Sequence, residues 1–221
     1  MNLTLRVGVL VFLSVLTVRA ETIASSPGTN KIADLTFVSF DVETTGLSPK
    51  TERIIEYGAI KFTTSKTEEE KSWLINPRRR ITAGAKKVHG ITHDMIKRER
   101  IFRTVYPEIM SFIDGSVLLA HNARFDISFF TEEIKRNNKA LPETMVIDTL
   151  PLFRQWFPDA PAHNLTALAD YLGVSGGEFH RGMSDAGYVV KIFQIGMKRP
   201  GAPETLDELI QHAGGRYFFT P

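Results

Sequence analysis

The sequence contains no cysteine, which excludes disulfides, thiolate metal sites and cysteine nucleophiles together. It has no repeat of fixed period and no long low-complexity tract, so a repeat architecture and a compositionally biased chain are also excluded. Of its 221 residues, 43% are hydrophobic and 24% are charged, and these values argue against disorder. A chain of this length and composition is expected to fold as a soluble globular protein with one good core.

The sequence also lacks a hydrophobic run of about 20 residues, the length that crosses a bilayer easily as a helix. A shorter apolar run covers residues 7–18, after Arg6 and before Arg19. A short basic start, a run of this length and small residues at its end are typical of a cleaved export signal. We therefore predict a signal peptide over 1–20, an exported (periplasmic or secreted) protein and no stable membrane span after cleavage. The alternatives are an uncleaved N-terminal anchor or a misread start codon, the latter with a cytoplasmic protein.

Once this signal is removed, the remaining chain has no excess of positive or negative charge. The chain has 27 Lys+Arg and 25 Asp+Glu, and residues 1–20 hold two arginines and no acids, so the mature chain has 25 of each. The charge is uneven, because nine basic residues between Arg78 and Arg103 stand against only Asp94 and Glu99, a local charge of +7. Such a patch attracts polyanions even on a neutral protein, although a solvated surface without a partner can have the same composition.

The order of the expected elements predicts an α/β fold with a central mixed β-sheet flanked by α-helices. Residues 21–34 are small and polar and are predicted to be a linker. A folded domain is expected over 35–198, followed by a C-terminal extension with a short helix over 199–221. The expected strands are 36–42, 53–62 with a bulge at Gly58, 71–76, 117–121 and 145–148, and the expected helices are 105–113, 125–137, 165–172, 186–197 and 206–212.

Two acidic residues stand at the end of the first expected strand. Asp41 and Glu43 are two positions apart, and because side chains alternate across a strand, their carboxylates share one face. The two charges repel, so each carboxylate would prefer to take up a proton, and a divalent cation removes that conflict. Mg²⁺ and Mn²⁺ favour oxygen ligands of this kind. Taken alone, however, such a pair more often marks a strand end that simply faces water.

Two later clusters carry further polar residues. In the first, a short apolar strand runs into Asn122 and then a helix with Asp126 in its first turn, where α/β sheets tend to place ligand sites. Either residue could instead only cap the helix. In the second, His180 lies in a loop and Asp185 opens the next helix. Histidine can accept a proton from water at neutral pH, but a lone loop histidine is usually inert, and such an aspartate usually only favours the helix dipole.

Together, in this order and on these elements, the clusters resemble the DEDDh family of 3′→5′ exonucleases. Similar members are the proofreading epsilon subunit of bacterial DNA polymerase III and the exonuclease domain of Gram-positive replicative polymerases. The resemblance covers residues 35–197 and rests on DVETTGL at 41–47, VHGIT at 88–92, HNxxFD at 121–126 and HxxxxD at 180–185. Gly182 and Met183 replace the Ala-Leu of many relatives, but the aspartate and the histidine of that motif are unaffected.

The resemblance implies a ribonuclease H-like fold, two divalent metal ions (Mg²⁺ or Mn²⁺) and release of nucleoside 5′-monophosphates from the 3′ ends of DNA or RNA. One metal would generate and align a hydroxide and the other would stabilise the leaving 3′ oxygen. The resemblance assigns the metals to Asp41, Glu43, Asp126 and Asp185, the general base to His180, and contacts with the terminal nucleotide to Thr44, Leu47, His89 and Asn122. Leu47 could instead be a core residue.

Three hypotheses remain for the whole protein. It is an exported exonuclease acting on single-stranded 3′ ends, a non-catalytic nucleic-acid-binding module of the same fold, or a cytoplasmic proofreading or RNA-trimming enzyme with a misread N terminus. Four acids and a histidine argue against a dead module, because a charge cluster is costly to bury. No polymerase partner or sliding-clamp peptide is expected from the sequence. Phe153, Trp156 and Phe157 either stack on bases or, as aromatic residues more often do, belong to the core of a helix.

Overall fold

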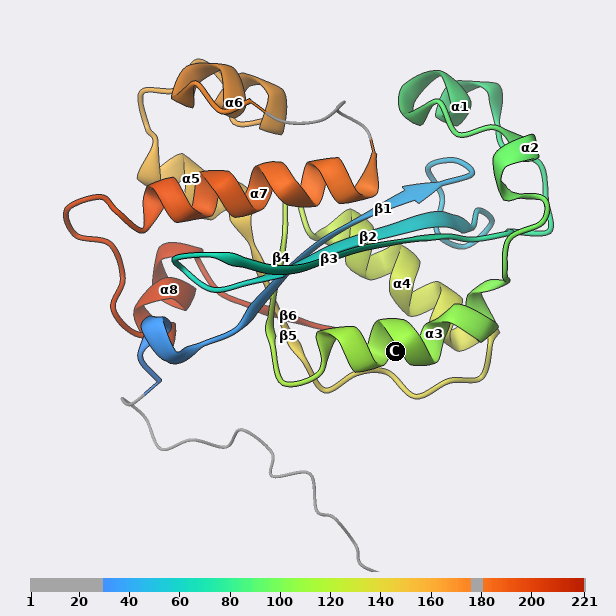
Figure 1. The fold of residues 1–221 in the computed structure, drawn as a ribbon, viewed down its shortest axis with the longest axis horizontal. Helices are drawn as coiled ribbons and strands as arrows, with labels where there is room; N and C mark the ends of the chain where they lie inside the picture. The colour runs from blue at the N-terminus through green and yellow to red at the C-terminus, as the bar shows by residue number, and fades with distance from the viewer. Residues whose placement is uncertain (1–29, 176–180, 221) are drawn as a thin grey trace, which may run out of the picture.

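The computed structural model describes residues 30–175 and 181–220 and shows a six-stranded mixed sheet with helices on its faces (Figure 1). The mixed sheet and its flanking helices confirm the predicted α/β architecture. The predicted signal over 1–20, most of the predicted linker and His180 lie outside the described residues. The strands, in spatial order, are β3 (Thr67–Leu74), β2 (Ile54–Phe62), β1 (Phe37–Thr44), β4 (Val117–Ala120), β5 (Met145–Asp148) and β6 (Tyr217–Phe218).

The central strand β1 is antiparallel to β2 and parallel to β4, and β4 is parallel to β5. The parallel strands β1, β4 and β5 therefore all end at the same edge of the sheet. The described helices are η1 (Ile32–Asp34), α1 (Ala83–His89), α2 (His93–Ile96), α3 (Phe102–Ile113), α4 (Arg124–Arg136), α5 (Thr149–Trp156), α6 (Leu165–Leu172), α7 (Gly182–Gly196) and α8 (Leu206–His212).

Alternation along β1 divides its side chains between two cores, one on each face of the sheet. Phe40 faces α3 and α4, and its ring stacks on Tyr57 of β2 at a centroid distance of 5.5 Å. Phe37 faces α5 and α7, and its ring lies 5.2 Å from that of Phe193 in α7. Because both faces are covered, β1 is buried along most of its length.

All five expected strands and all five expected helices are present; β5, α6 and α8 have the expected bounds, and the other seven have shifted ends. α3 begins at Phe102 rather than 105, and α7 begins at Gly182 rather than 186. The expected bulge at Gly58 is wrong, because Gly58 pairs regularly with Asp41 and the irregularities lie at other positions of β2. The aromatic residues 153, 156 and 157 are at most 5% exposed, so the core alternative is right and base stacking is excluded for them.

The chain begins to pack before the predicted domain start at residue 35. Ile32 is 2% exposed and its N–H donates to the Glu204 carbonyl oxygen at 2.9 Å, while the Leu206 N–H donates to the Asn30 carbonyl oxygen at 3.0 Å. Leu206 and Leu209 of α8 are buried in the core formed with α5 and α7. The described part of the C-terminal extension is thus packed onto the domain. Among the described residues, no helix combines the length and apolarity needed to span a membrane.

Candidate active site

Of the strands that the structure describes, none neighbours the last residues of β1 on the side where β4 pairs with its first residues. β4 is short and pairs only with residues 37–39 of β1, so the strand continues past its parallel neighbour. Asp41 and Glu43 lie in this continuation, on the face that α7 covers. Ligand sites of α/β sheets form outside the carboxyl ends of parallel strands, and the two acids are at that edge.

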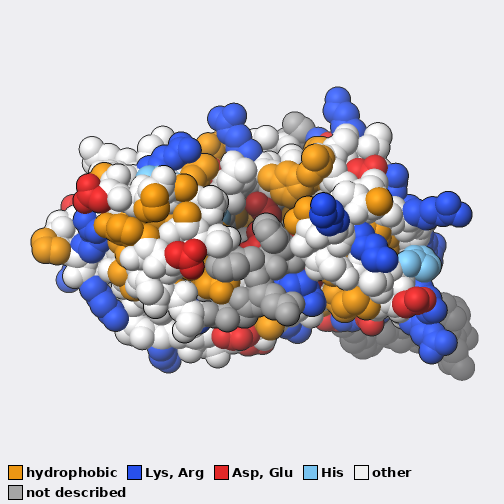
Figure 2. Space-filling view, turned by 90° about the horizontal axis from the view of Figure 1, so that it is seen from above, with side chains coloured by type: hydrophobic (Ala, Val, Ile, Leu, Met, Phe, Trp, Pro, Cys, Tyr) orange, Lys and Arg blue, Asp and Glu red, His pale blue; other side chains and the backbone are white. Residues whose placement is uncertain are grey.

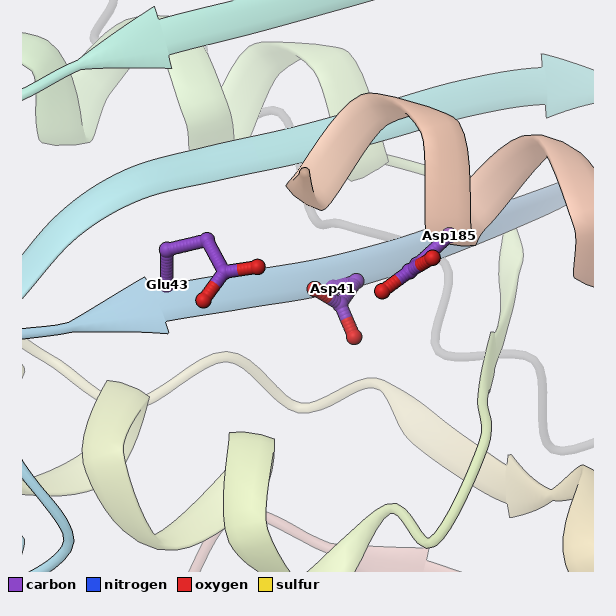
Figure 3. Close-up of side chains that lie close together, drawn as sticks. All are labelled: Asp41, Glu43 and Asp185. Atoms are coloured by element: carbon purple, nitrogen blue, oxygen red, sulfur yellow. The ribbon is translucent and has the colours of Figure 1, made fainter. Parts of the chain in front are cut away.

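Three carboxylates meet at this edge. Asp41 and Glu43 project from β1, and Asp185 reaches them from the first turn of α7 (Figure 3). One carboxylate oxygen of each lies within 4.8 Å of those of the other two. Glu43 and Asp185 are each only 9% exposed, so little water is available to stabilise the three charges.

Burial and mutual repulsion raise the pKa values of these carboxyl groups. Burial raises the pKa of Asp41 well above its ordinary value, and the charges of Asp126 and Glu43 raise it further. Burial, followed by the charge of Asp185, raises the pKa of Glu43 to about 8. The residues present fit a divalent cation, because a cluster of buried carboxylate oxygens is the donor set that Mg²⁺ and Mn²⁺ prefer and their charge would keep the cluster ionised.

Asp126 lies beside this group and also supports the open strand. It is 3% exposed in the first turn of α4, and its Oδ1 accepts a hydrogen bond from the Val42 N–H at 3.0 Å. This bond replaces the pairing that β4 no longer provides to β1. Burial raises the pKa of Asp126 to about 7, although the Val42 N–H lowers it. Asp126 is therefore a fourth acid at the site, with one oxygen committed to the backbone.

The sequence analysis missed Asp148, which organises the chain around Asn122. Asn122 has a left-handed backbone with φ of 61°, and its N–H donates to Asp148 Oδ1 at 2.9 Å. The same oxygen accepts the Leu150 N–H and so caps α5. Asp148 ends β5 at the edge where Asp41 lies, and its position at the end of an expected strand was the signal that could have identified it. Asp148 thus fixes the turn between β4 and α4, which places Asp126 at the site.

Glu56 of β2 is a second residue that the sequence analysis missed, and it holds the start of α7. Its side chain is 2% exposed, and its two oxygens accept hydrogen bonds from Arg181 Nε and Nη2 at 3.1 and 3.2 Å. Glu56 also accepts the Gly182 N–H at 3.2 Å and the Ser72 hydroxyl at 2.8 Å. A buried carboxylate with this many charged and polar donors is well satisfied. Because Arg181 precedes the helix, the network sets where α7, and with it Asp185, begins.

Gly58 lies two residues further along β2 and allows the same helix start to approach closely. A Cβ atom built on Gly58 would lie 2.0 Å from the Met183 nitrogen and 2.1 Å from the Gly182 carbonyl carbon. A Cβ on Gly182 would in turn lie 3.0 Å from the Asp41 carbonyl oxygen. No side chain fits between β2 and the start of α7, and this contact, rather than a bulge, explains the glycine.

The acids line a cleft of about 730 Å³, together with the four residues predicted to bind substrate. Figure 2 shows a hollow near the middle of this face with acidic side chains at its bottom, while basic side chains gather over the end that carries α1 and α2. His180 is the one predicted site residue that is outside the described residues. The predicted residues that line the cleft are Asp41, Glu43, Thr44, Leu47, His89, Asn122, Asp126 and Asp185.

Leu47 is 87% exposed at the rim of the cleft, so the alternative that it is a core residue is wrong. Thr44 and His89 are buried and support the turn that carries it. The His89 Nδ1 accepts the Ile91 N–H at 3.0 Å, so Nε2 carries the proton and donates to the Thr44 carbonyl oxygen at 3.2 Å. The Thr44 hydroxyl donates to the Gly46 carbonyl oxygen at 2.6 Å.

Comparison with protein families matches residues 38–193 to a family described as exonuclease (RNase_T). The chain is 34% identical over 163 residues to a PolC-type DNA polymerase III of Clostridium perfringens, which covers 74% of the chain and 11% of that protein. It is 36% identical over 170 residues to the DNA polymerase III epsilon subunit of Rickettsia prowazekii, covering 73% and 74%. The chain thus spans about a tenth of the polymerase relatives and about three quarters of the epsilon subunit.

Solved structures confirm the ribonuclease H-like fold. Exonuclease X in complex with 5′ overhanging duplex DNA has a TM-score of 0.62 at 22% identity and covers 80% of the chain and 99% of its own. The nuclease domain of 3′hExo, a DEDDh family member bound to rAMP, has a TM-score of 0.67 at 19% identity and covers 76% and 93%. At these identities the likeness concerns the fold.

The raised pKa values predict a metal-free protein that loses stability as the pH rises. In the folded protein, carboxyl groups with raised pKa values are protonated at low pH, and ionising them at higher pH costs free energy. Their contribution to stability is therefore fully present near pH 4 and is lost as the pH rises through about 7 to 8. In EDTA, the free energy of unfolding should fall by about 2 kcal/mol or more between about pH 5.5 and about pH 8.5. Urea unfolding, monitored by circular dichroism, measures this free energy of unfolding.

Addition of Mg²⁺ should restore the stability at the higher pH, and Glu43→Gln should flatten the profile measured in EDTA. A wild-type profile that does not change with pH in EDTA would contradict the buried repulsion.

Close packing at Gly58 predicts that Gly58→Ala weakens metal binding without unfolding the sheet. The added Cβ forces the start of α7 away from β2 and separates Asp185 from Asp41 and Glu43. The dissociation constant for Mn²⁺, measured by calorimetry, should rise at least about tenfold, which corresponds to about 1.4 kcal/mol. Gly187→Ala is the matched control in the same helix, because its Cβ would lie at an ordinary 3.4 Å from Ile60 Cδ1. Equal affinities in the two variants would disprove this role of Gly58.

Proposed function

The chain belongs to the exonuclease family, and from this premise we propose that it removes nucleotides one at a time from the 3′ ends of nucleic acid with the help of two divalent cations. The activity is that of a 3′→5′ exonuclease, a phosphodiester hydrolase. The observation that carries the two-metal proposal is the group of three carboxylates, with Asp126 beside them, that lines the cleft. A binding module would have no use for charges that raise one another's pKa values in this way.

Asp41, Glu43 and Asp185 are proposed to hold the cations, which are Mg²⁺ or Mn²⁺ by the chemistry of the donors. When bound, the cations supply positive charge that lowers the pKa of water and offsets the charge that develops on the phosphate. Asp126 keeps the end of β1 in place through the Val42 N–H and adds negative charge beside the same site. Glu56 and Gly58 keep Asp185 within reach of the two acids of β1.

His180 is proposed as the general base that takes the proton of the attacking water. It directly precedes Arg181, whose guanidinium is fixed on Glu56, and it is five residues from Asp185. The network that anchors the helix start therefore also restricts the chain next to the proposed base. Released products would be nucleoside 5′-monophosphates.

The substrate is proposed to be a single-stranded 3′ end, with the terminal nucleotide next to Thr44, Leu47, His89 and Asn122. The exposed Leu47 offers an apolar surface at the rim, and Val88 of α1, 56% exposed, lines the same cleft. Lys86 and Lys87 are exposed on α1 and would attract a polyanion to it. Among similar structures, an exonuclease I is bound to single-stranded DNA and 3′hExo is bound to rAMP. These complexes support both DNA and RNA as proposed substrates.

The experiment that tests this function measures mononucleotide release from labelled single-stranded DNA and RNA in the presence of Mg²⁺ or Mn²⁺. Asp41→Asn should lower the rate at least about 1,000-fold, a loss of about 4 kcal/mol of transition-state stabilisation. Asp159→Asn is the control, because Asp159 is an exposed acid outside the cleft. His180→Ala should lose about 100-fold or more while it keeps Mn²⁺ affinity. A wild-type protein that releases no nucleotide with either metal would end the proposal.

Export is proposed from the N-terminal sequence, and the epsilon subunits among the relatives favour a cytoplasmic proofreading enzyme as the second candidate. Fractionation of cells that express the full-length chain, with mass analysis of its N terminus, separates the two. The export proposal expects a processed chain that begins near residue 21 and lies outside the cytoplasm. An intact N terminus in the cytoplasmic fraction would favour proofreading or RNA trimming.

A further inference from the structure

A second hollow lies next to the cleft, against the C-terminal strand β6. The family match ends at residue 193, so β6 is outside the region that the exonuclease family defines. β6 is the outermost strand of the sheet and pairs antiparallel with β5, with Val146 opposite Tyr217. Together with α4 and the connection between β1 and β2, it encloses a groove of about 430 Å³, which we call the β6 groove.

The β6 groove continues the cleft, because the same two segments form the walls of both. The connection after β1 provides Leu47 and Ser48 to the cleft and Lys50 to the groove. The start of α4 provides Phe125 to the cleft and Arg124 to the groove. The two hollows are thus on either side of the same two segments.

The charge of the β6 groove suits a polyanion. Lys50, Arg124 and Lys135 line it against Glu132 alone, which leaves a net charge of +2. Lys135 pairs with Glu132 at 3.4 Å. Lys50 and Arg124 are exposed and have no acidic partner within 4.0 Å in the described part of the chain. Two basic groups are thus available at the side of the groove next to the cleft.

Aromatic rings accompany these charges. The Arg124 guanidinium lies 5.6 Å from the centre of the Tyr217 ring, and Phe218 is 46% exposed. The next residue, Phe219, is only 5% exposed, and its ring lies 5.5 Å from that of Phe130 in α4. Phe219 anchors the end of the chain, so the exposure of Phe218 is not the result of a loose strand end. Basic groups interleaved with accessible rings are typical of surfaces that bind single strands.

We propose that the β6 groove binds the part of a single-stranded nucleic acid that lies upstream of the 3′ end in the cleft. Its phosphates contact Lys50 and Arg124, and its bases stack on Tyr217 and Phe218. The inference rests on the proposed exonuclease function and adds to it a binding site for nucleotides that are not being cleaved. Charge complementarity and continuity with the cleft favour this occupant over a protein segment.

The test compares a long and a short substrate in the variant Lys50→Glu/Arg124→Glu. The long substrate is a labelled single-stranded oligonucleotide of about 12 nucleotides. The short one is the p-nitrophenyl ester of thymidine 5′-monophosphate, which fills only the cleft. For the long substrate, kcat/KM should fall at least about tenfold in the variant, and for the short one it should stay within about twofold of the wild type. Phe218→Ser should lower only the value for the long substrate.

Lys198→Glu is the control for nonspecific electrostatics, because Lys198 is exposed beyond the far end of α7, in a different hollow. Fluorescence anisotropy in EDTA measures binding of the same oligonucleotide without hydrolysis. The dependence of log Kd on log salt should become shallower by about 1.4 in the double variant, since about 0.7 is lost per phosphate contact with a single strand.

Three results would overturn the inference: unchanged kcat/KM for the long substrate, an equal loss on both substrates, or an equal loss in Lys198→Glu. A dimer in light scattering that the double variant dissociates would assign the groove to a second copy instead. If the wild-type protein hydrolyses neither substrate, the proposed function fails, and the anisotropy measurement still decides whether the groove binds the oligonucleotide.

Discussion

The close contact between β2 and the start of α7 is the constraint on which the site depends. Gly58 and Gly182 bring two backbones together with no side chain between them, and Glu56 fastens the junction by binding Arg181 and the Gly182 N–H. Asp185 follows three residues later and meets Asp41 and Glu43 of β1. The three acids come from two elements more than a hundred residues apart in sequence, so their separation depends on how the start of α7 packs against the sheet.

The same arrangement has an electrostatic cost. Bringing carboxylates together under a helix raises the pKa values of Asp41, Glu43 and Asp126, which means that the folded chain resists ionising its own site. The scaffold tolerates this because both faces of β1 are covered by large apolar cores whose burial stabilises the strand. A cation bound at these acids would therefore also stabilise the fold, which links stability to metal binding.

Local patterns in the sequence were sufficient for strands β1 to β5, for helices α3, α4, α6, α7 and α8, and for the acidic pair. The alternation along β1 predicted that Asp41 and Glu43 share a face, and the structure has them there. Helix α1 was not expected because its only large apolar residue, Val88, is exposed, so no apolar face marks it; the Thr82 cap and left-handed Gly90 at its ends define it instead. Glu56 looked like an ordinary strand residue, because its partner Arg181 is 125 positions away and no local pattern joins them.

Gly58 illustrates the same limit. A glycine inside a strand indicates either a bulge or a close approach, and the sequence could not distinguish the two because the approaching segment is distant along the chain. Strand β6 was missed for a different reason: two residues are too few to show any period. The sequence alone therefore did not reveal the contacts between segments that are distant along the chain, although it contains every residue that makes them.

Helix α7 also separates the two ends of the domain. It begins at the acidic cluster and ends about 22 Å away, since fifteen residues rise by about 1.5 Å each. At that far end, Ile32 and Met197 line one hollow, and the first described residues are hydrogen-bonded to the segment before α8 (Figure 1). The first described residues are therefore at the end of the domain opposite the cleft, and none of residues 30–36 lines it. The mouth of the cleft is thus left open by this part of the chain.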